Sequence, residues 1–511
     1  MTVGSVVILV TMVLYLLMML GIGIKYTKKN NSADDFYLGG RKLGPFVTAM
    51  SAEASDMSSW LLMGLPGVAY LSGVCDAAWT AIGLAVGTWL NWLIVSKRIR
   101  RYSQSIGAIT IPDFFGKRYH DDRNIITCLA ALIIVVFFIP YTASGFAACG
   151  KLFHTLFNVD YMWAMIFCAV IIVGYTALGG FIAASTTDLI QSVVMTIALV
   201  VVLVYGTVQA GGAGAVVENA KALPGFLSMV QTHNSETGGT SPYGFLTIIS
   251  TLAWGLGYFG MPHILLRFMA SKNEKQLKLS RRLATVWVVI SMACSIMIGV
   301  IGLGMTRNKT MDVLTGSSSE TVIVNIAHLL STHGVLCAVL AGVILAGIMA
   351  ATMSTADSQL LVAASSISQN FFRDFLHIKI SDRASVIIAR VTVVIISIIA
   401  VFMARDPNSS IFGIVSFAWA GFGAAFGPVV LLSLFWKRSN KYGAIAGIIS
   451  GGAMVFVWKY LVRPLGGAFD IYELLPAFVI ALVINVVVCL FTPAPGDDIK
   501  EEFERSKNPA E

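Results

Sequence analysis

The chain has 511 residues, of which 57% are hydrophobic and 12% charged, and its mean hydropathy is +0.80. This composition is too apolar for a soluble protein of several domains and predicts an all-α polytopic membrane protein embedded in a lipid bilayer. The net charge of +8 does not indicate a nucleic-acid partner, because the basic residues lie in short loops between apolar segments. The seven cysteines are scattered without CxxC spacing, which argues against a zinc site or a disulfide framework.

About thirteen apolar segments are long enough to cross a bilayer. The first has no positive charge before it and about 22 apolar residues, which predicts a retained helix and not a cleaved signal peptide. The predicted spans are 4–25, 46–70, 77–96, 124–153, 160–180, 186–210, 243–269, 283–305, 321–370, 386–404, 411–435, 442–461 and 472–492.

Lysine and arginine residues are distributed unevenly among the predicted loops. If the N-terminus is outside, only seven of the 35 fall on the outer side, and the basic residues at 267–282 form one of the cytoplasmic loops. One missing span would invert every later loop, so this bias predicts an outer N-terminus and a cytoplasmic C-terminus in the cell membrane. The seven outer residues are Lys151, Lys221, Arg307, Lys309, Arg405, Lys459 and Arg463.

The second segment carries the strongest functional signal. It contains Glu53, Asp56 and a Gly-Leu-Pro-Gly stretch at 64–67, all of which ordinary spanning helices avoid. A carboxylate near mid-membrane costs at least ~2.5 kcal/mol, and interrupted helices are tolerated there only when they line a site buried in protein or filled with water. We therefore predict a helix broken at 64–67 that forms part of an ion or substrate site.

The segment at 251–270 predicts a second break, because Gly255, Gly257, Gly260 and Pro262 interrupt it. Segments 2–6 and 7–11 then form two halves of opposite topology, each opening with a broken helix. Such a pair indicates an inverted-repeat transporter with a five-plus-five core and a site near the midplane. Unrelated kinks are the alternative, since glycine and proline are common in spanning helices.

This reading divides the chain into six regions. The spans outside the two repeats are the first helix and two peripheral C-terminal helices, and the tail after them reads as a solvated cytoplasmic end. The regions are 1–45 (first helix and first cytoplasmic loop), 46–210 (first repeat), 211–242 (extracellular loop), 243–435 (second repeat), 436–492 (peripheral helices) and 493–511 (cytoplasmic tail).

The ninth segment carries a polar stripe. Ala351, Ser354, Thr355 and Ser358 lie at i, i+3, i+4 and i+7, and Asp357 is beside them. Hydroxyl and carboxylate oxygens that face carbonyls freed by a broken helix suit a monovalent cation, which must replace its hydration shell. Packing of helices through small residues is the alternative.

Asp188 is a further carboxylate at membrane depth. It follows Gly179 and Gly180 and is predicted one turn inside the sixth helix. There it could either cap the start of the helix or bind an ion.

Aromatic residues near the two breaks predict a substrate pocket. Rings with a polar tip can enclose an aliphatic substrate and hydrogen-bond its ends. Interfacial anchoring is the alternative, but Trp254 and Tyr258 are i and i+4 within the broken segment, which favours the pocket. The residues are Trp60, Tyr141, Trp254, Tyr258 and Phe259.

The sequence indicates neither an enzyme nor an ATP-driven pump. It contains no GxxxxGK[ST] motif and no His/Cys/Asp cluster with ligand spacing, so we expect no cofactor. Transport would be driven by an ion gradient, in which one charge moved through 100 mV is worth roughly 2.3 kcal/mol. A passive channel is disfavoured because the carboxylates are dispersed over three helices without rings or repeated filter loops.

Four long stretches resemble the sodium/solute symporter family, and most closely its sodium/proline symporters, in a resemblance that covers nearly the whole chain. The resemblance implies about thirteen helices around a five-plus-five inverted-repeat core, with Na⁺ flowing inward as the coupling ion for uptake of L-proline by alternating access, in a protein that works as a monomer. The stretches are LGGRKLGPFVTAMSAEASDMSSWLLMGLPG (38–67), AWGLGYFGMPHILLRFMA (253–270), MSTADSQLLVAASS (353–366) and SFAWAGFGAAFGPVVLLSLFW (416–436).

The resemblance also implies roles for single residues. Asp56 looks like the carboxylate that sodium affinity requires, and Arg41 matches an inner-side arginine that acts in coupling. The implied sodium ligands are the carbonyls of Ala54 and Met57 together with Ala351, Ser354 and Thr355. The implied proline pocket is formed by Ser58, Trp60, Tyr141, Trp254, Tyr258 and Pro262.

Four positions depart from the proline-symporter pattern: Glu53, Ser59, Met261 and Asp357. Met261 replaces a pocket amide by a thioether, so another small amino acid or a monocarboxylate is an alternative substrate, and a non-transporting ligand sensor of the same fold is a further alternative. Asp357 adds a carboxylate where some relatives have a second sodium site. A second cation is therefore expected at Asp188, Ser354, Asp357 and Ser358.

Overall fold

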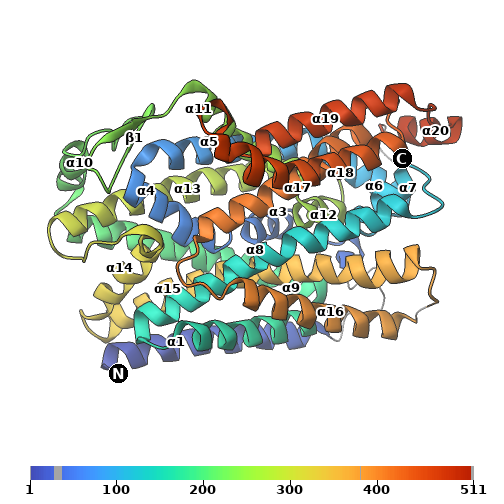
Figure 1. Ribbon diagram of the computed structural model, residues 1–511. Coiled ribbons are helices and arrows are strands. Elements are labelled where there is room, and N and C mark those ends of the chain that lie inside the picture. Colours follow the sequence, from blue (N-terminus) through green and yellow to red (C-terminus); the bar gives the residue numbers. More distant parts are fainter. Residues whose placement is uncertain (1, 28–36, 380, 508–511) are drawn as a thin grey trace.

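The computed structural model describes residues 2–27, 37–379 and 381–507. Long helices lie side by side along one axis, and the marked N- and C-terminal ends of the chain lie at opposite ends of this bundle (Figure 1). Termini at opposite ends fit an odd number of spans. The strands of the described residues form one antiparallel hairpin, in which β1 (Gln231–His233) pairs with β2 (Thr240–Pro242).

The first half of the chain runs from α1 to α10, and the label η denotes a 3-10 or π-helical segment. The elements are α1 (Val3–Thr27), η1 (Gly39–Arg41), α3 (Pro45–Asp56), η2 (Trp60–Gly64), α4 (Leu65–Ser72), α5 (Val74–Leu90), η3 (Asn91–Val95), α6 (Ser96–Ser105), α7 (Ile111–Arg118), α8 (Ile125–Phe157), α9 (Tyr161–Gln209) and α10 (Ala213–Lys221). A left-handed glycine, Gly180 (φ 68°), divides α9 into two helices, as the predicted spans require.

The second half runs from α11 to α20. Its elements are α11 (Phe245–Leu252), η4 (Ala253–Gly260), α12 (Pro262–Ala270), α13 (Leu277–Arg307), η5 (Gly316–Thr321), α14 (Val322–Ser331), α15 (Val335–Ser365), η6 (Ser366–Phe375), α16 (Asp382–Met403), α17 (Ile411–Phe435), α18 (Lys441–Val457), η7 (Trp458–Val462), η8 (Arg463–Leu465), η9 (Gly467–Phe469), α19 (Leu474–Phe491) and α20 (Asp497–Arg505).

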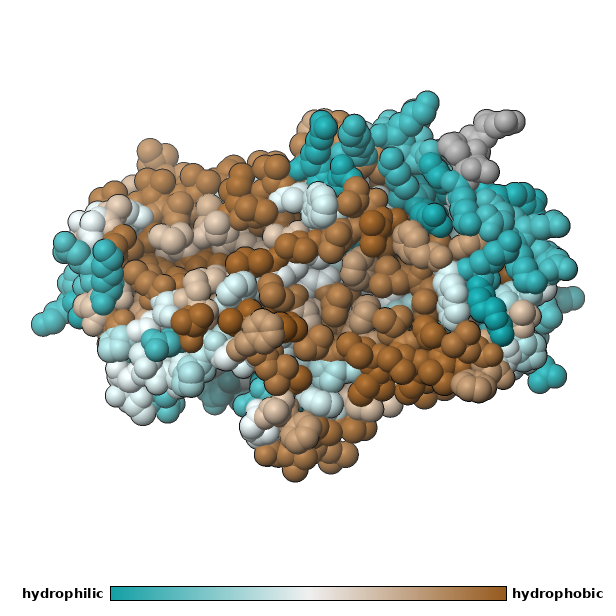
Figure 2. Space-filling view, turned by 90° about the horizontal axis from the view of Figure 1, so that it is seen from above, coloured by the Kyte–Doolittle hydropathy of each residue, from teal (hydrophilic) through white to brown (hydrophobic). Residues whose placement is uncertain are grey.

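The polytopic all-α architecture is confirmed. Ten helices of the described residues are long and apolar enough to cross a membrane, and the bent pair Phe245–Gly260 and Pro262–Ala270 makes an eleventh candidate. Two shorter apolar helices, Trp60–Ser72 and Tyr161–Gly174, lie at two further predicted spans, so the count of thirteen stays a prediction. Hydrophobic side chains cover much of the surface, and hydrophilic ones gather at the end that carries α20 (Figure 2).

The first break is real, but the predicted position at 64–67 is wrong. The chain leaves helical geometry at Met57 (φ −76°, ψ 68°), whereas Gly64 is helical. Pro66 lies in the first turn of α4, where a missing amide costs little. Gly67 serves close packing, because a Cβ there would lie 3.0 Å from the backbone nitrogen of Glu320.

The second break is confirmed. The 3-10 segment η4 ends at Gly260, the next residue, Met261, is extended (φ −76°, ψ 108°), and α12 starts at Pro262 after a bend of 46°. The glycines before the break allow close packing against α5, since a Cβ on Gly255 would lie 2.3 Å from the carbonyl oxygen of Gly83. Two of the predicted spans are therefore broken helices, whereas the division of the chain into two repeats stays a prediction.

The predicted C-terminal tail is largely exposed in its described part, but it contains a short helix that the sequence analysis did not predict. Residues 497–505 form α20, and the side chain of Phe503 is only 1% exposed. It packs against Tyr102 of α6, with ring centroids 6.5 Å apart, and against the guanidinium of Arg118. A short charged helix is thus fixed to the bundle by one aromatic anchor.

Candidate functional site

The first broken helix meets α15 in the interior of the bundle. The hydroxyl of Ser354 in α15 donates a hydrogen bond to the carbonyl oxygen of Ala54 in α3 at 2.7 Å. This carbonyl is available because the amide of Ser58, its regular helical partner, donates to the carbonyl of Asp56 instead. The break therefore supplies a backbone oxygen to the polar face of α15.

The predicted polar stripe is buried and faces this break. The Ser354 Oγ also lies 3.1 Å from the carbonyl oxygen of Ala351, and the buried Thr355 Oγ1 has no hydrogen-bond partner within the described residues. Met57 directly follows α3, and its ψ of 68° turns its carbonyl away from the helix direction. Three of the predicted sodium ligands, Ala54, Ala351 and Ser354, are thus brought together. An oxygen cluster beside an unpartnered buried hydroxyl fits a hard monovalent cation.

Asp56 connects the first break to the second. Tyr258 of η4 donates its hydroxyl to Asp56 Oδ2 at 2.6 Å. The backbone carbonyl of Asp56 accepts from Trp60 Nε1 and from the hydroxyl of Tyr141, both at 3.3 Å. Asp56 Oδ1 is buried without a partner among the described residues. Three residues of the predicted pocket therefore converge on Asp56, Tyr258 at its carboxylate and Trp60 and Tyr141 at its backbone carbonyl.

Trp254 lies at the centre of a buried aromatic cluster. Its ring centroid is 6.2 Å from that of Trp60 and 5.3 Å from that of Phe412, and it stacks on Tyr472 at 5.1 Å. Its carbonyl accepts a hydrogen bond from Trp419 Nε1 at 2.8 Å. Phe412 is partly buried against the core, and the other four side chains are at most 9% exposed. The arrangement provides a wall against which an aliphatic ring can pack.

Sequence reasoning missed several residues of this cluster. Trp419 also packs edge-on against Tyr258, with centroids 5.0 Å apart, and Asn91 donates to the carbonyl of Tyr258 at 3.0 Å. The stretch at 416–436 contains Trp419 and offered a signal for it. Tyr472 is the first residue of the last predicted peripheral span, and nothing in its local sequence distinguishes it from an interfacial anchor.

A buried arginine lies where the second cation was expected. The side chain of Arg267 is 1% exposed and donates to Asp188 Oδ2 at 3.1 Å, to Ser358 Oγ at 2.5 Å and to the carbonyl of His263 at 2.9 Å. Its Nε donates to Ser51 Oγ at 2.9 Å. The placement of Arg267 in a cytoplasmic loop is therefore wrong, because α12 carries it into the interior.

This cluster still has unused carboxylate oxygens. Asp188 also accepts from Ser51 at 2.6 Å, and Asp357 accepts from Ser358 at 3.2 Å. Asp188 Oδ1 and Asp357 Oδ2 have no partner within the described residues. The carboxylate of Asp188 bonds to side chains of other segments and not to amides at a helix start, so the capping interpretation is wrong. Ser354, the fourth predicted ligand, bonds to the first break instead.

Arg41 joins three segments at the end of the bundle that carries α20. Its guanidinium donates to the carbonyl of Met269 at 2.9 Å, to Ser103 Oγ at 3.1 Å and to the carbonyl of Ala108 at 2.5 Å. Just after it, Leu43 bonds to the backbone at the end of α12. Arg41 therefore lies where α6, the end of α12 and the segment before α7 meet.

The remaining departures from the family pattern are buried residues in or next to the two broken helices. Glu53 is buried and accepts from Trp92 Nε1 at 2.9 Å, so one of its oxygens is satisfied. Met261 is the extended residue at the second break, and Pro262 follows it as the first residue of α12. Ser59 precedes η2, and its buried hydroxyl has no partner in the described part of the chain.

Comparisons with known proteins agree with this geometry. A model of the sodium:solute symporter family matches residues 36–451. A sodium/proline symporter of Haemophilus influenzae is 40% identical over 504 residues, which cover 98% of this chain and 97% of the relative. The osmoregulated proline transporter OpuE of Bacillus subtilis is 39% identical over 494 residues, which cover 96% of each chain.

Solved structures show the same fold. The substrate-bound outward-open state of a Na⁺-coupled sialic acid symporter aligns with a TM-score of 0.77 and 18% identity, covering 96% of this chain and 99% of that one. The nucleobase-cation symporter MHP1 aligns with a TM-score of 0.56 and 16% identity, covering 92% of this chain and 98% of that one. At these identities the likeness concerns the fold alone.

Proposed function

The chain belongs to the sodium:solute symporter family, and on that premise we propose that it couples inward Na⁺ flow to uptake of L-proline by alternating access. It is a multi-pass membrane transporter and not an enzyme. Curated relatives that share 39–40% of its residues over almost their whole length carry names that specify proline. The N-terminus would lie outside and the C-terminus in the cytoplasm, an assignment supported by the basic loops and by the opposite positions of the two ends (Figure 1).

One observation carries the proposal: the hydrogen bond from Ser354 to the carbonyl freed at Ala54 joins the first break to α15 beside the unpartnered Thr355. Sodium would be held by the oxygens of Ala54, Met57, Ala351, Ser354 and Thr355. The partial negative charges of these carbonyl and hydroxyl oxygens would stabilise the positive charge of the transported ion. Its binding would brace α3 against α15, and coupling between sodium and proline must be reciprocal.

The substrate would lie next to Asp56, between the two breaks. The aromatic wall around Trp254 suits the ring of proline, and Tyr258 would connect that wall to the sodium side through its bond to Asp56. The start of α12 at Pro262 offers free amides and a positive helix end for the carboxylate of the substrate. Because Met261 departs from the proline-symporter pattern, the assignment of proline as substrate needs a test. The test is competition of labelled proline uptake by other amino acids and by monocarboxylates.

A second cation is a further proposal for the Arg267 cluster. Arg267 pairs with the buried carboxylate of Asp188, whereas the buried carboxylate of Asp357 accepts from Ser358, so the charge of Asp357 has no counter-charge among the groups that bond to it in the described residues. A cation bound at the unpartnered oxygens of the two carboxylates, together with Ser354 and Ser358, would supply it. Reversal potentials in proteoliposomes give the sodium:proline ratio, and a strict ratio of one would refute the proposal of a second transported cation.

Arg41 is proposed to act in coupling, because it ties α12 to α6 and to the segment before α7. Opening toward the cytoplasm would require these bonds to rearrange. An Arg41→Lys exchange keeps the charge but cannot reproduce the planar fork. It should slow proline uptake while sodium still increases proline binding in equilibrium measurements. Unchanged uptake would contradict the assignment.

The central test is uptake of radiolabelled proline by the purified protein in vesicles, with inward gradients of Na⁺, Li⁺ or H⁺. Ser354→Ala should raise the sodium concentration for half-maximal uptake at least about tenfold, equivalent to ~1.4 kcal/mol. Ser365→Ala is the matched control, because among the described residues this buried hydroxyl of α15 bonds only to the carbonyl of Val362 in its own helix. Uptake that ignores sodium, or equal sodium curves for both variants, would refute the proposed site.

A further inference from the structure

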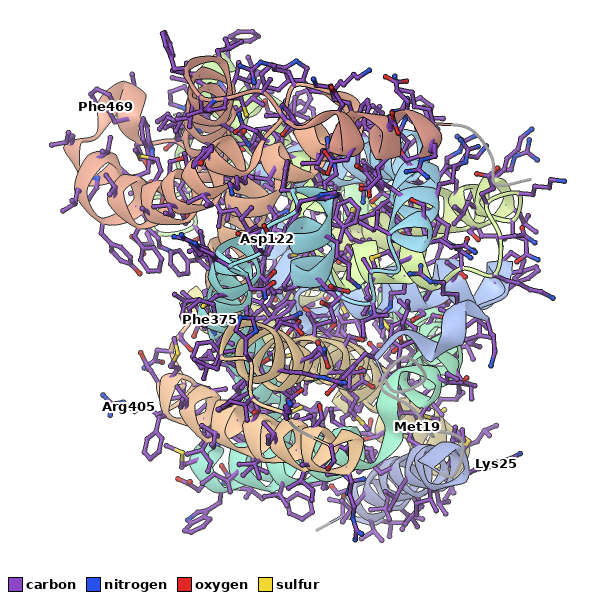
Figure 3. All side chains as sticks on the ribbon, turned by 90° about the vertical axis from the view of Figure 1, so that its right-hand side faces the viewer. Met19, Lys25, Asp122, Phe375, Arg405 and Phe469 are labelled. Atoms are coloured by element: carbon purple, nitrogen blue, oxygen red, sulfur yellow. The ribbon has the colours of Figure 1, made fainter. Side chains whose placement is uncertain are left out.

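The end of the molecule that carries α20 contains a cavity between three segments that are distant in sequence. Its volume is about 700 Å³, and it lies between α6, the loop from α12 to α13, and the end of α20. Arg101 holds two of these segments together, because its guanidinium bonds to Glu274 in the loop and donates to the carbonyl of Lys507 at 2.7 Å. Figure 3 faces this end, with Asp122 near the centre of the view and Lys25 at its edge.

The cavity is strongly positive. Two basic residues of α6, two of the loop and one of α20 line it, against a single carboxylate. These residues are Arg100, Arg101, Lys272, Lys275 and Arg505, and the carboxylate is Glu274.

Two of the five cations are already engaged by the protein. Arg100 donates to the carbonyls of Ser271 at 2.5 Å and Lys272 at 3.2 Å, and its Nη1 donates to Gln104 at 2.6 Å. Glu274 forms an ion pair with Arg101. The hydrogen bond from Arg101 and the nearby positive charges of α6 hold the pKa of Glu274 below its usual range. The loop carboxylate therefore stays ionised and is not free to neutralise other cations.

The other three cations have no partner in the part of the chain that the structure describes. Within residues 2–27, 37–379 and 381–507, the side chains of Lys272, Lys275 and Arg505 make no ion pair and no hydrogen bond. They belong to two segments that face each other across the cavity and repel each other. An anion placed between them would convert this repulsion into attraction.

We propose that this cavity binds a phosphate-bearing anion that bridges Lys272 and Lys275 to Arg505. Several oxygens around one phosphorus can accept from ammonium and guanidinium donors at once. The volume accommodates more than a single small ion. Both a phospholipid headgroup and a soluble polyphosphate have this chemistry, and basic residues next to a membrane attract anionic headgroups.

Binding would have a structural consequence. Residues 271 and 272 directly follow α12, the inner half of the second broken helix. An anion that joins this point to α20 would fasten the C-terminal helix to an element that has to move during alternating access. Binding of an anionic lipid or of a soluble phosphate at this site would therefore affect the movement that transport requires. Binding of the anion itself does not depend on the transported substrate.

The test uses the full-length protein in nanodiscs and has two arms. One arm replaces phosphatidylcholine by phosphatidylglycerol, and the other adds inorganic pyrophosphate to phosphatidylcholine discs. Two readouts are followed: thermal stability and hydrogen exchange of the α20 amides. The proteins are the parent, Arg505→Gln and the double variant Lys272→Gln with Lys275→Gln. The control is the double variant Lys221→Gln with Lys309→Gln, which removes the same charge from two exposed lysines elsewhere.

We expect the anion to stabilise the parent and to protect α20 from exchange, with the response requiring at least about tenfold more anion in the cavity variants and unchanged in the control. A response in the lipid arm alone identifies a headgroup, and one in the pyrophosphate arm alone identifies a soluble phosphate. Responses in both arms identify the phosphate chemistry itself. No response in either arm, or equal responses of parent and cavity variants, would overturn the proposal.

Discussion

Removal of the Arg267 side chain should be among the most destabilising single changes in this protein. The guanidinium is 1% exposed and donates four hydrogen bonds at 2.5–3.1 Å. Arg267→Leu fills similar space with an apolar chain but leaves the Asp188 carboxylate, which is fully buried, without its ion-pair partner. Breaking a buried pair by removing one member costs about 3–5 kcal/mol, because the remaining charge is uncompensated.

A double-mutant cycle separates this electrostatic cost from lost packing. Thermal denaturation of the purified protein is compared for Arg267→Leu, for Asp188→Asn and for the combination. Removing both charges should be less destabilising than the sum of the single changes, by up to about 3 kcal/mol. Arg98→Leu is the control, since Arg98 is partly exposed and donates to the carbonyl of Leu434 at 2.8 Å. Additive single effects, or an Arg267→Leu variant as stable as the control, would refute the reasoning.

Three further changes test other parts of the structure. Lys151→Met leaves Glu320, 4% exposed and bonded to Lys151 at 2.6 Å, without its counter-charge, so unfolding free energy should fall by about 3–5 kcal/mol in thermal denaturation. Gly257→Ala would place a Cβ 1.9 Å from Trp419 Nε1, and we expect it to abolish both folding yield and proline uptake. Phe503→Ala removes the buried anchor of α20, so the amides of that helix should lose their hydrogen-exchange protection while the spans keep theirs.

Each of these changes has an exposed counterpart that should be almost neutral. Lys309→Met removes an exposed charge, Gly244→Ala adds a methyl group with nothing within 4 Å, and Phe491→Ala removes a ring that is 87% exposed. A Lys151 or Gly257 variant that behaves like its counterpart would show that the described packing does not decide stability there. Protection of α20 that survives Phe503→Ala would mean that its surface ion pairs suffice to hold it.

Several features of the fold could be predicted because they depend on local composition. Long apolar runs have to be satisfied as helices in a bilayer, so the spans follow from hydropathy. The second break was predictable because glycines and a proline interrupt that segment around Met261. The first segment is also broken, but not at the glycines and proline that suggested it. The stripe from Ala351 to Ser358 was visible because helical periodicity alone places these residues on one face.

The errors arise where one residue type serves two purposes. The Gly-Leu-Pro-Gly stretch reads as a break, but Gly67 is there to let Glu320 approach, while the chain actually leaves helical geometry at Met57, whose side chain gives no such signal. The tail reads as solvated because it is charged, and its described part is largely exposed. Whether Phe503 anchors it depends on Tyr102 and Arg118, which are about four hundred residues away in the chain.

The sequence by itself determined the membrane class, the second helix break and the oxygen-rich face of α15, because these depend on hydropathy and on periodicity within single segments. Only the tertiary structure decided that Ser354 reaches Ala54, that Tyr258 reaches Asp56 and that Arg267 is buried beside Asp188. Such contacts join residues 79 to 300 positions apart. Their formation depends on how whole helices pack, since a buried charge or a freed carbonyl finds its partner only when the surrounding helices are in place.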